Sequence, residues 1–194
     1  MWRLEKIQRL FEHHPTAKVY AVGGFVRDGL MKGPHAIKDI DIEIHGVEPI
    51  QVLDMLTWKF KNVSEVGKSF GVFKIRDDNG TEYDISLPRK DSKTSSGHTG
   101  FDVSINPFMG IREALRRRDF TINAMAYHTD GEALTLHDPF GGHADLQDKI
   151  LRVVDPETFV EDPLRVLRGV QFASRFGLTI EPETFELMRR LVCQ

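Results

Sequence analysis

The chain has 194 residues, of which 40% are hydrophobic and 28% charged, and its formal net charge is −3. These values predict a globular chain of one domain, or one domain and part of a second, and exclude a uniformly basic nucleic-acid coat. A single cysteine, Cys193, excludes an intrachain disulfide framework and a thiolate zinc site, which favours a reducing, cytoplasmic compartment. No segment has the apolar length of a membrane span, so we expect no membrane partner.

The first elements in chain order are a helix, a strand, a short helix and a strand of alternating charge. Apolar spacing predicts a helix over residues 2–14, ending before a proline. The stretch "KVYAVGG" predicts a buried strand stopped by glycines, with a brief helix over 25–33 after it. In "IKDIDIEIHG" isoleucines alternate with Asp39, Asp41 and Glu43, which predicts a strand with one apolar and one acidic face.

The rest of the chain predicts a helix, a hairpin and a helical end. Helical spacing appears in "IQVLDMLTWKF", and the strands "GVFKIRD" and "EYDISLP" are joined by a turn ending in Asn-Gly, which is a hairpin signal. The polar residues 90–100 have the composition of a mobile loop. Residues 111–129 are predicted to be helical, 133–149 to form a strand, a turn and a short helix, and the pattern from Pro163 is helical to the end.

The acidic strand and the glycine turn carry the chemistry that the residues themselves suggest. Carboxylates two positions apart on a strand project side by side and suit a hard divalent cation, although a solvated edge strand is the commoner explanation of such a pattern. Gly23 and Gly24 allow an anion to approach the backbone, and Arg27 adds a forked donor for phosphate. Together they favour a triphosphate cradle beside a two-metal platform, with Asp84 as a third carboxylate or as an ordinary exposed acid.

Five ordered motifs, "GGFVRD", "DID", "RRDFTINAMAY", "DPFGGHADL" and "EDPLRVLR", resemble those of the class II tRNA nucleotidyltransferase and bacterial poly(A) polymerase family. The resemblance covers about residues 19–176. It implies an α/β fold, with a polymerase-beta-like nucleotidyltransferase head of small mixed sheet and helices over 1–150 and the start of an all-helical neck over 151–194. It also implies an enzyme that adds CMP or AMP from CTP or ATP to the 3′ end of tRNA with two Mg²⁺ ions, releasing pyrophosphate.

The same resemblance assigns roles to single positions. It implies that Asp39 and Asp41 hold catalytic magnesium and that Asp84 is the third catalytic carboxylate. The residues implied in nucleotide binding are Gly23, Gly24, Arg27, Asp28, Arg117, Arg118, Asp119, Asn123, Asp162, Arg165 and Arg168. Asp162 and Arg165 match the pair that reads the base edge, since Asp accepts from an amino group and Arg donates; the alternative is an ion pair within one helix.

Several alternatives stay open at this level. The motifs do not separate CCA addition from CC-only, A-only or poly(A) addition. The chain ends at "FELMRRLVCQ", one or two helices into the implied neck, so a nucleotide-binding module without independent catalysis is a second hypothesis. The three adjacent arginines also suit an RNA backbone. The expected partners are the tRNA 3′ end and nucleoside triphosphates, and no pattern indicates an oligomeric state.

Overall fold

The computed structural model describes residues 2–33, 39–66, 71–93, 101–129 and 133–192, with the backbone alone for 2–3, 39, 90–93 and 101–103. Its helices are α1 (Trp2–Phe11), α2 (Gly24–Lys32), α3 (Pro49–Lys59), α4 (Ile111–Arg116), α5 (Gly142–Gln147), α6 (Pro156–Phe159), α7 (Leu164–Phe176) and α8 (Pro182–Val192), with a 3₁₀ turn η2 (Thr121–Asn123). Its strands are β1 (Lys18–Val22), β2 (Asp39–His45), β3 (Val63–Val66), β4 (Val72–Arg76), β5 (Glu82–Ser86), β6 (Arg89–Lys93), β7 (Phe101–Ile105), β8 (Ala126–Thr129), β9 (Leu134–His137), β10 (Ile150–Leu151) and β11 (Thr179–Ile180).

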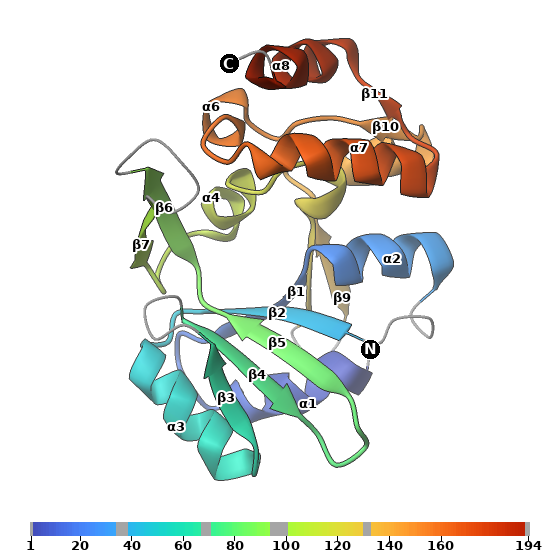
Figure 1. Cartoon of the computed structure of the whole chain (residues 1–194). Coiled ribbons are helices and arrows are strands. Elements are labelled where there is room, and N and C mark those ends of the chain that lie inside the picture. The colour runs from blue at the N-terminus through green and yellow to red at the C-terminus, as the bar shows by residue number, and fades with distance from the viewer. Residues whose placement is uncertain (1, 34–38, 67–70, 94–100, 130–132, 193–194) are drawn as a thin grey trace.

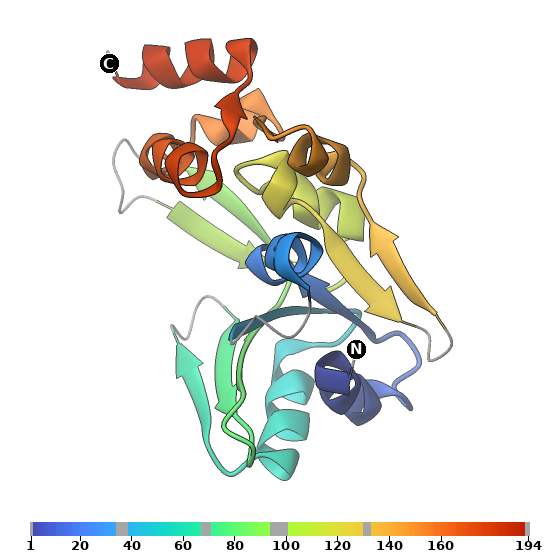
Figure 2. The same ribbon diagram turned by 90° about the vertical axis from the view of Figure 1, so that its right-hand side faces the viewer.

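A mixed sheet with the order β3-β4-β5-β2-β1-β8-β9 is the framework of the molecule (Figure 1). Helices α1 and α3 cover one face of this sheet, whereas α2 and α4 lie on the other side, toward the C-terminal helices. A view turned by 90° shows α7 and α8 as a layer at the opposite end of the molecule from α1 and α3 (Figure 2). The mixed α/β fold predicted from the sequence is confirmed.

Strand β2 is interior to the sheet, pairing antiparallel with β1 and parallel with β5. Its residues Ile40, Ile42 and Ile44 are fully buried in the core against α1 and α3. The alternation predicted for this strand is therefore confirmed, and the explanation of its acids as a solvated edge does not hold. The acidic face instead looks toward the side of the sheet that carries α2 and α4.

The predicted hairpin is also confirmed, since β4 and β5 pair antiparallel. The carboxylate of Asp77 accepts hydrogen bonds from the backbone N–H groups of Asn79 and Thr81, and Gly80 has a φ of 77°. Asp77 is buried, and its second oxygen accepts from Lys6 at 3.0 Å. The turn is thus held by a side-chain cap that also ties it to helix α1.

Two sequence predictions are wrong in part. The helix expected over 111–129 ends at Arg116, and Ala126–Thr129 form β8 between β1 and β9. Residues 120–126 are all buried, so sheet pairing and burial on every side outweigh the local helical spacing. The loop expected over 90–100 begins as a strand, because Arg89–Lys93 pair with Phe101–Ile105, and its remainder lies outside the described residues.

The helical prediction after Pro163 is confirmed in α7 and α8, which are separated by the short strand β11 pairing parallel with β10. These helices share a core with the segment near η2, since Phe120 contacts both Phe159 and Phe172 edge-to-face. Packing there is close enough that a Cβ on Gly169 would lie 2.9 Å from the Phe120 ring. Within the described ranges, no helix combines the length and apolar character needed to cross a membrane.

Candidate nucleotide site

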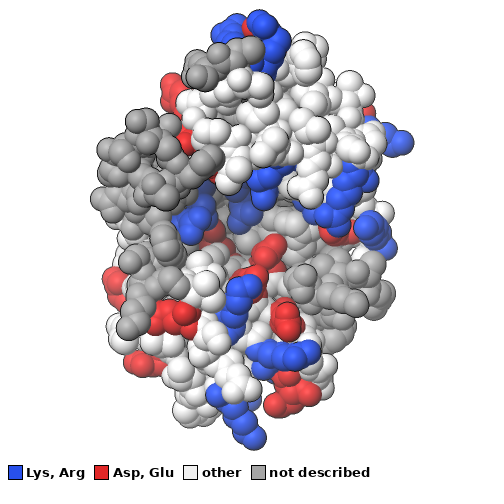
Figure 3. Space-filling view, viewed as in Figure 1, with Lys and Arg blue, Asp and Glu red and all other residues white. Residues whose placement is uncertain are grey.

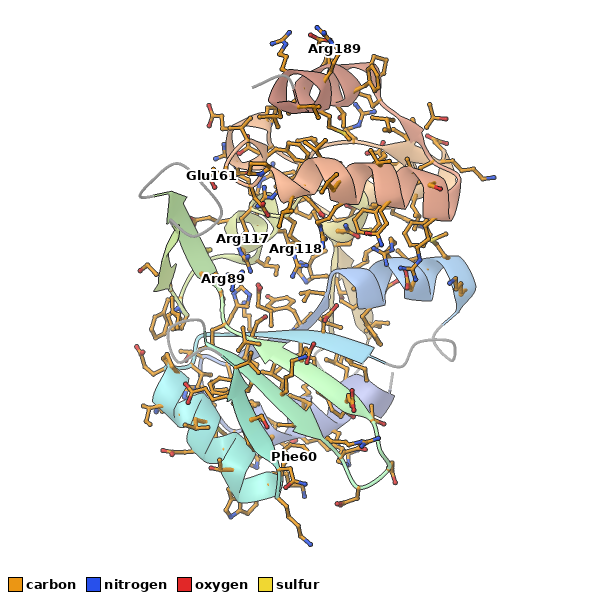
Figure 4. The ribbon with its side chains drawn as sticks, viewed as in Figure 1. Phe60, Arg89, Arg117, Arg118, Glu161 and Arg189 are labelled. Carbon is orange, nitrogen blue, oxygen red and sulfur yellow. The ribbon has the colours of Figure 1, made fainter. Side chains whose placement is uncertain are left out.

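A hollow opens between the sheet and the C-terminal helices on the face shown in Figure 3. Lysine and arginine side chains gather on its upper side, and acidic side chains lie below them. Arg117 and Arg118, from the end of α4, point with Arg89 into the space between the sheet and α7 (Figure 4). This separation of charge, with cations facing carboxylates across a gap, suits a polyanion that carries its own cations.

The glycine turn forms the floor of this site. Gly23 has a φ of 63° and a ψ of −130°, and it joins the buried strand β1 to helix α2. A Cβ on Gly23 would lie 2.5 Å from Nη1 of Arg118 and 3.8 Å from Oδ2 of Asp41, and one on Gly24 would lie 3.7 Å from the same Asp41 oxygen. The backbone conformation requires glycine at position 23, and a side chain there would displace the end of the Arg118 side chain.

We expect Gly23→Ala to destabilise the protein by about 1–3 kcal/mol, because a side chain there is strained in this backbone conformation. The new methyl group also displaces the guanidinium of Arg118, so CTP affinity should fall roughly tenfold. Thermal melts and isothermal titration with CTP measure the two effects. Gly110→Ala is the matched control, since Gly110 has a φ of −68° and nothing within 4 Å of the added Cβ; equal effects at both glycines would contradict the prediction.

Two predicted carboxylates lie next to each other on neighbouring strands. In the parallel pairing of β2 with β5, Asp41 is directly opposite Asp84, so both side chains leave the same face of the sheet. Lys74 on β4 contacts Asp84, with Nζ 3.0 Å from Oδ1. For Asp39 the structure gives only the backbone, opposite Glu82, so the prediction for its side chain lies outside the described residues. Among the side chains that are described, no three His, Cys, Asp or Glu residues group as metal ligands.

Glu43, the third acid of β2, has a different environment. Its side chain is fully buried, and Oε1 lies 2.9 Å from Nε2 of His45. Its other oxygen, Oε2, lies 3.3 Å from Nη2 of Arg117 and 3.9 Å from Nη2 of Arg118. The other ring nitrogen of His45, Nδ1, lies 2.8 Å from the carbonyl oxygen of Met109.

The pKa of Glu43 reflects these contacts. Burial alone would raise it, but the hydrogen bond from His45 and the charges of Arg118 and Arg117 outweigh burial and lower the pKa to about 2. The ionised carboxylate of Glu43 therefore stabilises the fold at pH values above 4.5, the ordinary pKa of a glutamate. This stabilisation is lost as the pH falls toward the lowered pKa of about 2. Burial lowers the pKa of Arg118, and the nearby charge of Glu43 acts in the opposite direction.

Five residues that the resemblance assigns to nucleotide binding form one hydrogen-bonded chain. Arg27 donates from Nε to Asp28 at 2.7 Å and from Nη1 to the side-chain oxygen of Asn123 at 2.5 Å. Asn123 donates to Oδ1 of Asp119 at 2.9 Å, and Oδ2 of Asp119 accepts from Arg168 at 2.7 and 2.8 Å. These hydrogen bonds link helix α2, η2 and helix α7.

Aromatic side chains of α7 complete this link. The guanidinium carbon of Arg27 lies 4.6 Å from the ring centroid of Phe176 and 5.3 Å from that of Phe172, and Arg168 lies 5.2 Å from Phe172. Such contacts stabilise a cation by about 0.5–2 kcal/mol where water is excluded. The guanidinium of Arg27 is therefore engaged by protein groups on its edge and on its face, and its Nη2 lies 3.5 Å from the position that a Cβ on Gly24 would take.

Asp162 and Arg165 lie where α7 begins. Asp162 precedes the helix and caps it, accepting from the N–H of Leu164 at 2.9 Å. Arg165 donates to two backbone oxygens, those of Thr158 and Arg117, each at 2.8 Å. The backbone N–H of Arg165 also donates to the carbonyl oxygen of Asp162 at 3.0 Å, and the Arg165 guanidinium fixes the backbone of the arginine segment.

Sequence reasoning missed the partners of Glu43 and the contacts of the Arg27 guanidinium with the rings of Phe172 and Phe176. Glu43 and Arg117 are 74 positions apart, and Arg27 and Asn123 are 96 apart, so no local spacing brings them together. The continuous apolar face of β2 indicated that the strand lies against a core, but it did not indicate which of its acids would be buried.

The fold and the site together define a nucleotidyltransferase-type head in which a glycine turn meets carboxylates on the adjoining strands. Residues 19–152 match the family described as the poly A polymerase head domain, and the chain belongs to that family.

The chain spans about two fifths of the length of the curated relatives that it matches. The multifunctional CCA protein of Nitrosomonas europaea is 44% identical over 175 residues, which cover 90% of this chain and 39% of that protein. The CCA-adding enzyme of Thermotoga maritima, solved in complex with tRNA, matches with a TM-score of 0.75 and 31% identity over 98% of this chain and 42% of that one. Structures of a CCA-adding enzyme with CTP and with ATP match with TM-scores of 0.76 and 0.77 at 31% and 32% identity, again over 98% and 42% of the two chains.

Proposed function

We propose that this chain carries the catalytic centre of a template-independent nucleotidyltransferase that adds CMP or AMP, or both, to the 3′ end of tRNA. The substrates are CTP and ATP, and pyrophosphate is released. The chain spans about two fifths of the length of its CCA-protein relatives. We therefore propose that tRNA binding requires the whole protein. Among the solved structures that it matches, CCA-adding enzymes are seen with tRNA, with CTP and with ATP.

One observation carries the proposal. Asp41 lies beside Asp84 on the parallel strand and within 4 Å of the positions that Cβ atoms would take on both glycines of the turn, where Arg118 lies at Gly23 and Arg27 at Gly24. A triphosphate bound along the turn has Arg118 as a donor and its reacting phosphate near the two carboxylates. The third predicted acid, Asp39, precedes Asp41 by two residues on the same face of β2.

These carboxylates fit magnesium, since Mg²⁺ prefers oxygen donors and binds through one or two carboxylates together with substrate phosphates. We assign Asp39 and Asp41 as its ligands, with two ions expected, and Asp84 as the third carboxylate of the centre. Bound magnesium would neutralise triphosphate charge and favour the ionised form of the attacking hydroxyl. The contact of Asp84 with Lys74 does not prevent this role, because both side chains are exposed and such pairs are weak.

We assign residues 1–150 to the nucleotidyltransferase head and 151–194 to the start of the helical neck, and we place the protein in the cytoplasm. The nucleotide contacts proposed in the head are Gly23, Gly24 and Arg118. Arg27, Asp28, Asp119, Asn123 and Arg168 support that site through their hydrogen-bonded chain. Asp162 and Arg165 lie at the start of α7, where a base would meet the neck.

A second candidate function is poly(A) addition, favoured by the match of residues 19–152 to the head domain of poly A polymerases. It uses the same centre and differs in the nucleotide and in the number of additions. One experiment separates the candidates. Purified protein is incubated with Mg²⁺ and with tRNA transcripts that end before the CCA, after one C or after CC, with CTP and ATP offered separately and together.

Additions of C to the first two transcripts and of a single A to the third support CCA addition, whereas long adenylate tails support the second candidate. Asp41→Asn, purified in parallel, controls for contaminating activity. If no transcript is extended but CTP or ATP still binds, the chain is a nucleotide-binding part whose catalysis needs the rest of the protein. Failure to bind either triphosphate would overturn the site.

A further inference from the structure

The buried carboxylate of Glu43 sits behind the arginine pair that faces the hollow. Its Oε2 is the shared contact of the Arg117 and Arg118 guanidinium groups, and its Oε1 meets His45. His45 is in turn held by the carbonyl oxygen of Met109. Both ends of the carboxylate are thus fixed, and so is its orientation in the core.

Arg118 has a separate end directed away from Glu43. Nη1 of Arg118 lies over the glycine turn, 2.5 Å from the point where a Cβ on Gly23 would stand. About four fifths of each arginine side chain is buried, and both point from α4 toward the space between the sheet and α7 (Figure 4). The Nε atom of Arg118 has no hydrogen-bond partner among the described residues.

Two guanidinium groups on consecutive residues repel each other, and burial makes that repulsion stronger than it is in water. The single anion of Glu43, in contact with both, offsets this repulsion. The backbone is held as well, because Arg165 donates to the carbonyl oxygen of Arg117 at 2.8 Å. Glu43 therefore constrains the positions of the two charges, and Arg165 constrains the chain that carries them.

We propose that Glu43 is a positioning residue for triphosphate binding, acting through Arg117 and Arg118 rather than by contact with the nucleotide or with magnesium. This proposal rests on the proposed function. It separates the three acids of β2 into two roles, because Asp41 faces the glycine turn whereas Glu43 is enclosed by cations. The ligand it serves is the phosphate chain of a nucleoside triphosphate, not its base or sugar.

A purely structural carboxylate would affect every nucleotide equally, which provides the test. Isothermal titration in constant Mg²⁺ compares CTP with CMP for the wild type and for Glu43→Gln, which keeps the side-chain shape and removes the charge. We expect the ratio of CTP to CMP affinity to fall about tenfold or more in the variant, with CMP affinity unchanged. The stoichiometry of each titration reports the folded fraction, so loss of folded protein does not imitate loss of affinity.

Glu65→Gln on strand β3 is the matched control, since Glu65 is exposed and far along the sheet from this site. If Glu43→Gln does not fold, Glu43→Asp takes its place, because it keeps the charge and withdraws it from the arginines by one methylene. An unchanged CTP to CMP ratio in a folded Glu43 variant overturns the positioning role. A wild type that binds CTP no better than CMP overturns the triphosphate site itself, and the positioning role with it.

Discussion

Asp41→Asn should reduce the rate of CMP or AMP transfer by about 10³-fold or more, while leaving the fold intact. The substitution keeps the size of the side chain and removes the charge next to Asp84 and the glycine turn. Several kcal/mol of transition-state stabilisation depend on charge at such a centre, and each 1.4 kcal/mol corresponds to a tenfold rate change. Single-turnover extension of a tRNA transcript ending in CC, with ATP, measures the loss.

The same variant should respond in the opposite direction when Mg²⁺ is absent. The Asp41 carboxylate then repels a triphosphate at the turn, so its removal should leave metal-free CTP binding equal to that of the wild type or tighter. Asp54→Asn, on the exposed side of α3, is the charge-matched control and should retain full activity. Activity of Asp41→Asn within tenfold of the wild type would remove Asp41 from the centre.

Local sequence patterns predicted correctly the elements whose signals lie within a few neighbouring residues. The isoleucines of β2 predicted its buried face, and Asn-Gly predicted the β4–β5 hairpin, because each signal lies within a few residues. The helix predicted for residues 120–129 was wrong because the environment of these residues is not local. Their apolar spacing suits a helix, but their burial comes from β1, β9 and the C-terminal helices, which are remote in sequence.

The candidate site divides in the same way. The residues of the glycine turn and the acidic strand are recognisable locally, and the parallel register that sets Asp41 opposite Asp84 agrees with their predicted association. Sequence did not indicate which acid of β2 would be buried, because the cations that select Glu43 come from the end of α4. It also did not indicate that Arg27 would be held between Asn123 and the rings of α7.

Asp119→Asn should destabilise the protein by about 2 kcal/mol, which corresponds to a fall of roughly 4–8 °C in Tm for a chain of this size. Asp119 is buried, and one oxygen accepts from Asn123 while the other accepts from Arg168 on α7. An amide at this position presents N–H groups to one of those donors and loses the charge that Arg168 requires. Because half of the Arg168 side chain is exposed, water limits the loss.

The effect should depend on Arg168, since the two residues form one interaction between η2 and α7. Adding Arg168→Gln to Asp119→Asn should cost less than the sum of the single changes, and Asp78→Asn in the hairpin turn should leave Tm unchanged. Titration with CTP on the same variants distinguishes support of the site from contact with the nucleotide. Loss of CTP binding at an unchanged Tm would mean that Asp119 meets the nucleotide directly, and that the link to α7 is not its main role.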